Sequence, residues 1–371
     1  MKKKDYVLLE PDHQFRGSES DRILASSDSL NFHQSLKDYQ PTASHSLNHR
    51  ANELGLKAIY LKDESSRFGL KAFKGLGTSY AVHRVLKSNP LIHTFCTATD
   101  GNHGKALAWS ASLARKRAVI IVPEHTTLAR IKAIEAEKAK VVRFEGNYDD
   151  TCKYAEKLSE QDGWKLVQDV AWDGYEEIPA NIMAGYLSMF KELEVNLHLP
   201  DKPLIDLVFL QAGVGSFAAS AVWYYLNRYG KHKPRIVIVE PKEADGILES
   251  FKQNELKTSF GRQETIMAGL NCGLPSSIAW PILKAGADAV IRIDDEYSEQ
   301  AMRMLYHNKS FDPQIIAGES GAAGLAGLLA ILNEEKFISV QDHLNISKSS
   351  RILIFNTEGD TDPTTFKKII T

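Results

Sequence analysis

The segment FGLKAFKGLGTSYAV places two lysines, Lys71 and Lys74, beside Gly75 and Gly77 at the start of a helical pattern. A lysine amine in a partly desolvated pocket has a lowered pKa and can form a Schiff base with a carbonyl compound. A lysine among charged neighbours is otherwise an ordinary surface residue. Taken alone, this segment leaves both interpretations open.

A glycine-rich loop follows the apolar run LIDLVFLQ and opens another helical pattern; it consists of Gly213, Val214, Gly215, Ser216 and Phe217. Glycines let the backbone approach an anion, and the N–H groups of a first helical turn point toward it. The loop therefore predicts a phosphate site. With Ala218 it also fits the G-x-G-x-x-A dinucleotide fingerprint, and Glu240 ends the next strand near the place of a ribose-binding acid. A structural glycine turn is the third interpretation.

Two aspartates stand at the ends of predicted strands. Asp100 begins the turn DGNH, which contains Asn102 and His103, and Asp169 ends the run KLVQD. The N–H groups at the start of the helix after DGNH are a natural site for a carboxylate. An aspartate at a helix start is usually a cap, and that is the plain alternative for both residues.

Strands and helices alternate from about residue 91. The runs LIHTFCTA, RAVIIVP, KVVRFE and KLVQD are separated by helical patterns, and a second alternation runs from IPANIMAGYLSMFKELE to RILIFN. Such alternation predicts βαβ units and mostly parallel sheets. The first forty or so residues are polar and irregular, and are expected to wrap the surface as an arm.

The predicted fold is α/β, with two doubly wound, mostly parallel three-layer domains. A small domain (90–178) is expected to be inserted into a large one (1–89 and 179–371). Ligands in such folds bind beyond the carboxyl ends of the strands, where the glycine loop and both aspartates fall.

Seven segments together resemble the diaminopropionate ammonia-lyases, which are fold-type II (tryptophan synthase β-like) pyridoxal-phosphate enzymes. They are LKDESSRFGLKAFKGLG, ATDGNHGKALAW, VQDVAWDGYEEIP, QAGVGSFAAS, MAGLNCG, GESGAAGL and NTEGDTDP, in this order from about residue 60 to 363. The resemblance implies pyridoxal 5'-phosphate as the cofactor and a homodimer. It also implies α,β-elimination of 2,3-diaminopropionate, in the D form, the L form or both, to pyruvate and ammonia.

The resemblance also implies roles for single residues. Lys74, with Phe73 beside it, matches the lysine that carries the cofactor, and Asn102 matches the asparagine that bonds its ring hydroxyl. Asp100 and Asp169 match two acids that would take the α-proton from either enantiomer. Thr357 matches the hydroxyl residue that faces the pyridine nitrogen.

The remaining motif residues are then expected to be structural or peripheral. Residues 213–217 become the cradle of the cofactor phosphate, and Glu240 becomes a structural or pocket-wall acid. Lys71 stands where an uncharged residue is expected, and we expect it to point to solvent. His103 is expected to be structural, Glu358 to point away from the ring nitrogen, and Cys272 to be a buried thiol rather than part of a pocket wall.

Composition excludes several classes of protein. Of 371 residues, 43% are hydrophobic and 25% charged, which is typical of a soluble globular protein. A net charge of −2 offers no basic field for nucleic acid or an anionic membrane, so a small amino acid is the expected partner. The start MKKKDYVLLE lacks an apolar signal core, and three cysteines form no CxxC pair, so a cytoplasmic protein is expected. We predict no metal ligands.

Other functions fit parts of the sequence. A serine- or threonine-type dehydratase, or a lyase for another β-substituted amino acid, would use the same motifs. An NAD(P)-dependent oxidoreductase would use GVGSFA and Glu240, but leaves DGNHG, QDVAWDGY and TEGDTDP unexplained. A catalytically silent binding protein is disfavoured by the joint presence of Lys74, Asp100, Asn102 and Asp169.

Overall fold

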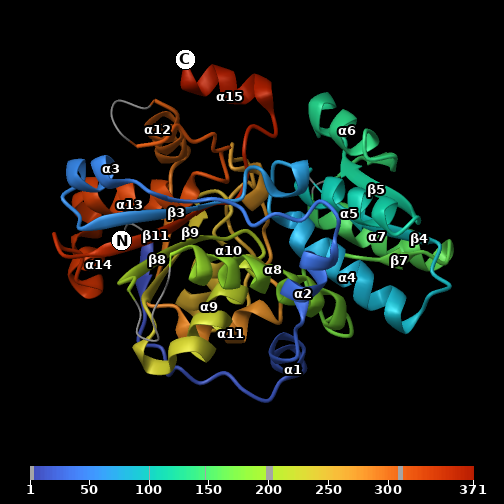
Figure 1. Cartoon of the computed structure of the whole chain (residues 1–371), viewed down its shortest axis with the longest axis horizontal. Helices are drawn as coiled ribbons and strands as arrows, with labels where there is room; N and C mark the ends of the chain where they lie inside the picture. Colours follow the sequence, from blue (N-terminus) through green and yellow to red (C-terminus); the bar gives the residue numbers. More distant parts are fainter. Residues whose placement is uncertain (1–3, 100, 147, 198–203, 308–311) are drawn as a thin grey trace.

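The computed structural model describes residues 4–99, 101–146, 148–197, 204–307 and 312–371, which form two open sheets with helices on their faces (Figure 1). The seven-stranded sheet has the order β1-β10-β9-β8-β11-β3-β2. Its strands are β1 (Tyr6–Leu8), β2 (Ser44–Ser46), β3 (Ala58–Asp63), β8 (Leu207–Gln211), β9 (Arg235–Pro241), β10 (Ala289–Ile293) and β11 (Arg351–Asn356). The five inner strands are parallel to one another, and the edge strands β1 and β2 are antiparallel to their neighbours.

Helices cover both faces of this sheet, which explains why its central strands are continuous apolar runs. In β8, Val208 and Leu210 pack in the same core as α8 (Glu177–Asn196) and α9 (Ser216–Tyr229). Leu207 and Phe209 point the other way and pack in the core that contains α13 (Ala323–Asn333). Further helices associated with the seven-stranded sheet are α3 (Asn48–Glu53), α10 (Gly246–Gln253), α11 (Ala279–Gly286), α12 (Asp295–Tyr306), α14 (Ile338–Leu344) and α15 (Pro363–Ile370).

The four-stranded sheet has the order β6-β5-β4-β7, and all its strand pairs are parallel. Its elements are β4 (Thr94–Ala98), α5 (Asn102–Leu113), β5 (Arg117–Pro123), α6 (Leu128–Glu135), β6 (Lys140–Phe144), α7 (Tyr148–Gln161) and β7 (Lys165–Leu166). They all lie between β3 and β8 in the sequence, so the smaller layer is inserted into the larger one. The predicted α/β fold is thereby confirmed, whereas the domain limits at residues 90 and 178 stay a prediction.

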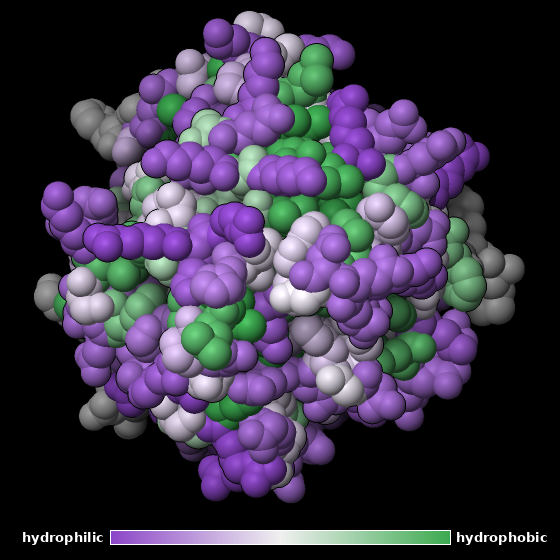
Figure 2. All heavy atoms as spheres, turned by 90° about the vertical axis from the view of Figure 1, so that its right-hand side faces the viewer, coloured by the Kyte–Doolittle hydropathy of each residue, from purple (hydrophilic) through white to green (hydrophobic). Residues whose placement is uncertain are grey.

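Helix α4 (Lys74–Ser88) lies between the two layers and contacts both α8 and α5. Figure 2 views the molecule from the side of the four-stranded sheet, where polar side chains cover most of the face and apolar residues show between them. Among the helices that the structure describes, none is long and apolar enough to cross a membrane.

The expectation of an irregular N-terminal arm is wrong. The segment forms β1, which pairs with β10, and two helices, α1 (Glu19–Ala25) and α2 (Ser29–Ser35). Leu24 and His33 of these helices are buried against the larger layer. The regular pattern also begins before residue 91, because β3 is an inner strand of the larger sheet. These elements are short, so each carries too few apolar residues to show a periodicity.

A buried network of charges fixes the chain between β3 and α4. The guanidinium of Arg67 bonds Glu64 at 2.7 Å and Glu192 of α8 at 2.7 Å. Lys62 lies 2.8 Å from Glu192, and the Tyr39 hydroxyl donates to Glu192 at 2.6 Å. Two positive and two negative side chains therefore compensate one another inside the protein, and they tie the segment that leads to Lys74 to α8.

Candidate active site

A pocket lies between the two sheets, with an empty volume of about 880 Å³ that includes space open to solvent. It is lined by the segments that directly follow β4, β7, β8 and β11, and by the start of α4. The carboxyl ends of strands from both sheets therefore converge on one cavity, as expected for ligand sites in α/β folds.

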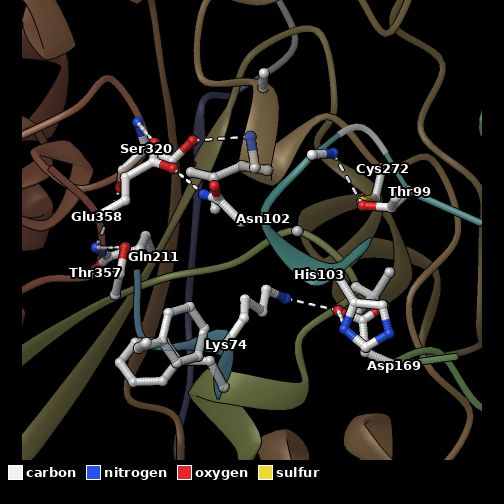
Figure 3. A pocket seen from close by; sticks show the side chains of 18 of the residues that line it. Lys74, Thr99, Asn102, His103, Asp169, Gln211, Cys272, Ser320, Thr357 and Glu358 are labelled. Carbon is white, nitrogen blue, oxygen red and sulfur yellow. Dashed lines mark hydrogen bonds and ion pairs between the residues drawn. The ribbon is translucent and has the colours of Figure 1, made fainter. Parts of the chain in front are cut away.

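Lys74 is the first residue of α4, with Phe73 at the N-cap position. Its Nζ atom donates to Oδ2 of Asp169 at 2.6 Å (Figure 3). Burial alone would lower the pKa of the Lys74 amine, but the Asp169 carboxylate raises it above its ordinary value. Burial would likewise raise the pKa of Asp169, yet the charge of Lys74 and its hydrogen bond hold it well below its ordinary value. The two groups therefore form an ammonium–carboxylate pair.

His103 lies behind this pair. Its Nε2 lies 2.8 Å from the carbonyl oxygen of Val167, so this nitrogen carries the proton. Its Nδ1 lies 3.6 Å from Oδ2 of Asp169, and burial lowers the pKa of His103. A neutral imidazole, anchored to the backbone, thus forms part of the wall around Asp169.

The glycine-rich loop joins β8 to α9. Gly215 is the N-cap of α9 and has a φ of 91°, a left-handed conformation that favours glycine. A Cβ atom at Gly213 would lie 3.1 Å from the Cα of Leu270, so a side chain there would crowd the backbone. Ser216 donates to the carbonyl oxygen of Asp169 at 2.6 Å and so ties the loop to the Lys74–Asp169 pair.

On another wall of the pocket, Asn102 at the start of α5 donates through Nδ2 to the carboxylate of Glu358. The other oxygen of Glu358 accepts the N–H of Ser320 at 3.0 Å. Next to Glu358, the Thr357 hydroxyl accepts a hydrogen bond of 3.0 Å from Gln211. This bond leaves the hydroxyl hydrogen of Thr357 available to a ligand.

The structure brings most of the predicted site residues to this one pocket. The wall includes Phe73, Lys74, Asn102, Asp169, Gly213, Val214, Gly215, Ser216, Phe217 and Thr357. Asp100 lies outside the described residues. Lys71 is 46% exposed at its side chain and pairs with Asp360 at 2.7 Å, in keeping with the expected solvent orientation. Which of these residues act in catalysis or binding stays a prediction.

Glu240 does not line the pocket. Its buried carboxylate accepts the N–H groups of Ile247 and Leu248 at 2.8 Å each and so caps the start of α10. Burial raises the pKa of Glu240 well above its ordinary value. The residue that fits the ribose position of the dinucleotide fingerprint is therefore a structural one.

Sequence reasoning missed several residues of the wall. The expectation of a buried Cys272 away from the pocket is wrong, because Cys272 is half-buried and lines it. Glu358 was assigned no role, and the wall also contains Thr99, Arg130, Gln211, Ala268 and Ser320. Several of these residues belong to motif segments already recognised in the sequence, such as QAG, MAG and GES. Membership of those motifs was the only sequence feature that could have predicted their place in the wall.

The residues present fit pyridoxal phosphate. The pocket offers a lysine amine and a glycine loop at a helix start, where a Cβ atom at Gly213 would lie only 3.1 Å from the Cα of Leu270.

The fold and the pocket define a pyridoxal-phosphate dependent enzyme, and the family of that description matches residues 36–341. A diaminopropionate ammonia-lyase of Salmonella typhimurium is 37% identical over 92% of this chain and 90% of its own length. The Escherichia coli K12 enzyme is 36% identical, over 97% and 95%. The chain belongs to the diaminopropionate ammonia-lyase family, as its motifs predicted, and its cofactor is pyridoxal 5'-phosphate.

Solved structures agree with this assignment. The Escherichia coli diaminopropionate ammonia-lyase in complex with D-serine has a TM-score of 0.90 and 33% identity, over 99% of this chain and 97% of that chain. The same enzyme in complex with an aminoacrylate-PLP azomethine reaction intermediate has a TM-score of 0.88 and 34% identity, with the same coverage. Threonine deaminase of Solanum lycopersicum, at 19% identity and a TM-score of 0.76, shares the fold.

Proposed function

We propose that this chain catalyses the α,β-elimination of 2,3-diaminopropionate to pyruvate and ammonia. The observation that carries the proposal is the Lys74–Asp169 pair, an amine and a carboxylate 2.6 Å apart in a pocket that also contains the glycine loop. Pyridoxal phosphate, when bound to Lys74, supplies the electron sink that makes the α-hydrogen of an amino acid acidic. The similarity to named diaminopropionate ammonia-lyases supports the substrate.

Three parts of the wall would hold the cofactor. The N–H groups of residues 213–217 and of the first turn of α9 suit the phosphate, and the Asn102 amide suits the ring hydroxyl. The Thr357 hydroxyl suits the pyridine nitrogen, because its oxygen already accepts from Gln211 and its hydrogen is left to donate. A neutral hydroxyl does not keep that nitrogen protonated, which favours rapid elimination over slower competing reactions.

We assign proton transfer to Asp100, Asp169 and Lys74. Asp169 is buried and faces Lys74, so it can take a proton from the substrate on one side and exchange it with the amine. We assign the proton of the opposite enantiomer to Asp100. The substrate carboxylate would meet the N–H groups at the start of α5 and the guanidinium of Arg130, whose side chain lies over Gly101.

The test is pyruvate formation by purified protein from D- and L-2,3-diaminopropionate, with serine and threonine assayed in parallel. We expect a yellow protein whose visible absorption changes on addition of the substrate, and we expect Lys74→Ala to lose both the colour and the activity. Lys71→Ala is the matched control, since this exposed lysine of the same segment should be dispensable. Pyruvate from serine or threonine alone would move the function to a dehydratase. A protein that pyridoxal phosphate never turns yellow would refute the proposal.

We further propose a cytoplasmic homodimer with domain limits at residues 90 and 178. The family resemblance supports the dimer, and three cysteines without a disulfide among the described residues suit a reducing compartment. Light scattering of the eluted protein tests the dimer, and limited proteolysis tests the domain limits.

A further inference from the structure

Glu358 places a second carboxylate on the pocket wall, in addition to Asp169. The residue is 5% exposed and lies just beyond β11, after Thr357. Its two oxygens accept from the side-chain amide of Asn102 and the backbone N–H of Ser320, which are both neutral donors. Figure 3 shows this contact on one side of the pocket and the Lys74–Asp169 pair on another.

The two carboxylates differ in their counter-ions. Asp169 is paired with the ammonium of Lys74, whereas no lysine, arginine or histidine of the described ranges forms an ion pair with Glu358. A buried carboxylate without a cation carries a desolvation cost that two neutral hydrogen bonds offset only in part. The charge of Glu358 also acts on the neighbouring Glu319. Burial raises the pKa of Glu319, and the repulsion from Glu358 raises it further, to about 7.

The backbone around Glu358 leaves space for this side chain. A Cβ atom at Gly318 would lie 3.1 Å from its Cγ and 3.2 Å from its Oε1. A Cβ atom at Gly269 would lie 3.9 Å from its Oε2. Two glycines thus surround the carboxylate, and the Ser320 N–H fixes its direction.

We propose that Glu358 is the specificity-determining residue that receives the β-ammonium group of the substrate. The inference rests on the proposed function, because 2,3-diaminopropionate differs from serine by carrying a second ammonium group in place of a hydroxyl. That ammonium supplies the cation that Glu358 lacks. It would approach from the cavity side, while Asn102 and Ser320 keep the carboxylate in place.

The negative charge of Glu358 also favours cleavage of the Cβ–N bond of the substrate. The α-hydrogen leaves to a base such as Asp169, the electron pair of the C–H bond forms the Cα–Cβ double bond, and the Cβ–N bond breaks with its pair going to nitrogen. The nitrogen departs as neutral ammonia only if it enters as ammonium. A negative charge beside the departing nitrogen favours that protonated form.

The experiment compares two substrates that give the same product. β-Chloroalanine also yields pyruvate by elimination, but its leaving group carries no positive charge. Glu358→Gln keeps the size of the side chain and an oxygen for Ser320, and removes the charge. We expect its kcat/KM to fall roughly 10- to 100-fold for 2,3-diaminopropionate, as for a lost hydrogen bond to a charged group. For β-chloroalanine it should stay within about threefold. Glu358→Asp, which keeps the charge, should keep the preference for the diamino acid.

Glu319→Gln is the matched control, since this neighbouring carboxylate does not line the pocket, and it should leave the ratio of the two kcat/KM values unchanged. An equal fall for both substrates in Glu358→Gln, with an altered visible band, would show that Glu358 acts through Asn102 and would overturn the inference. No fall for either would overturn it too. A wild-type protein that forms pyruvate from β-chloroalanine but none from 2,3-diaminopropionate would instead refute the proposed function.

Discussion

Gly185 of α8 faces Gly77 of α4 with no room for a side chain between them: a Cβ atom at Gly185 would lie 2.8 Å from the Cα of Gly77. A Cβ atom at Gly77 would in turn lie 2.6 Å from a ring carbon of Tyr186. Because α4 begins with Lys74, this close approach of two helices sets the position of the amine in the pocket.

Gly185→Ala should therefore impair stability and activity together. The added methyl group meets backbone atoms that cannot rotate away, and such overpacking costs about 1–3 kcal/mol. We expect a lower urea midpoint and a lower kcat, measured on the cofactor-loaded enzyme. Lys191→Ala, at a partly exposed position of the same helix, should leave both unchanged. A Gly185→Ala enzyme with wild-type kcat would show that α4 can shift without moving the amine.

Asp169→Asn should affect the two enantiomers of the substrate unequally. The amide keeps the shape but cannot accept a proton, and general bases contribute roughly 10²- to 10⁴-fold. We expect the kcat for one enantiomer to fall by at least about 100-fold and that for the other to fall much less. Asp173→Asn, an exposed aspartate nearby, is the control. Equal losses for D- and L-2,3-diaminopropionate would contradict the use of two bases.

Arg67→Met should be strongly destabilising. The substitution leaves Glu64 and Glu192 buried with Lys62 as their remaining cation, and breaking a buried ion pair costs about 3–5 kcal/mol. Urea unfolding at neutral pH measures the loss. Arg22→Met removes an exposed arginine and should cost less than about 1 kcal/mol. A similarly small loss for Arg67→Met would mean that the network contributes little.

His33 should make stability depend on pH. Burial lowers the pKa of His33 to about 3, and its ring nitrogens contact Ser188 and the carbonyl oxygen of Leu76. Between pH 6.5 and 3 the unfolded chain binds a proton that the folded protein excludes, so stability falls as pH falls, by about 1.4 kcal/mol per unit.

His33→Gln should reduce the slope of unfolding free energy against pH below 6.5, as measured by urea titrations at several pH values. His93→Gln, at an exposed histidine, should keep the wild-type slope. If His33→Gln also kept that slope, the proton uptake would have to be assigned to other groups.

The sequence predicted those parts of the site that are local in the chain. Lys74 and the loop 213–217 are recognisable because glycines and a helix start lie beside them. The contact of Asn102 with Glu358 joins residues 256 positions apart, and no local pattern carries that information. Glu358 therefore gained its place in the pocket only through the sheet order that puts the end of β11 opposite α5.

Charged residues were also hard to place. Arg67 and Glu192 resemble surface residues in the sequence, and their burial depends on mutual compensation across 125 positions. Glu240 fits a fingerprint by its spacing, yet the backbone N–H groups of α10 take up its carboxylate. The type of a residue and its spacing from a motif do not predict which helix start, that of α9 or that of α10, its carboxylate will contact.

The strand order also has a consequence for synthesis on the ribosome. The four strands of the smaller sheet occupy one continuous stretch, so that layer can assemble while translation continues. In contrast, β3 is complete by Asp63 but lies between β2 and β11, and β11 begins only at Arg351. Lys74 is therefore synthesised long before Thr357, although both residues line the same pocket in the folded protein.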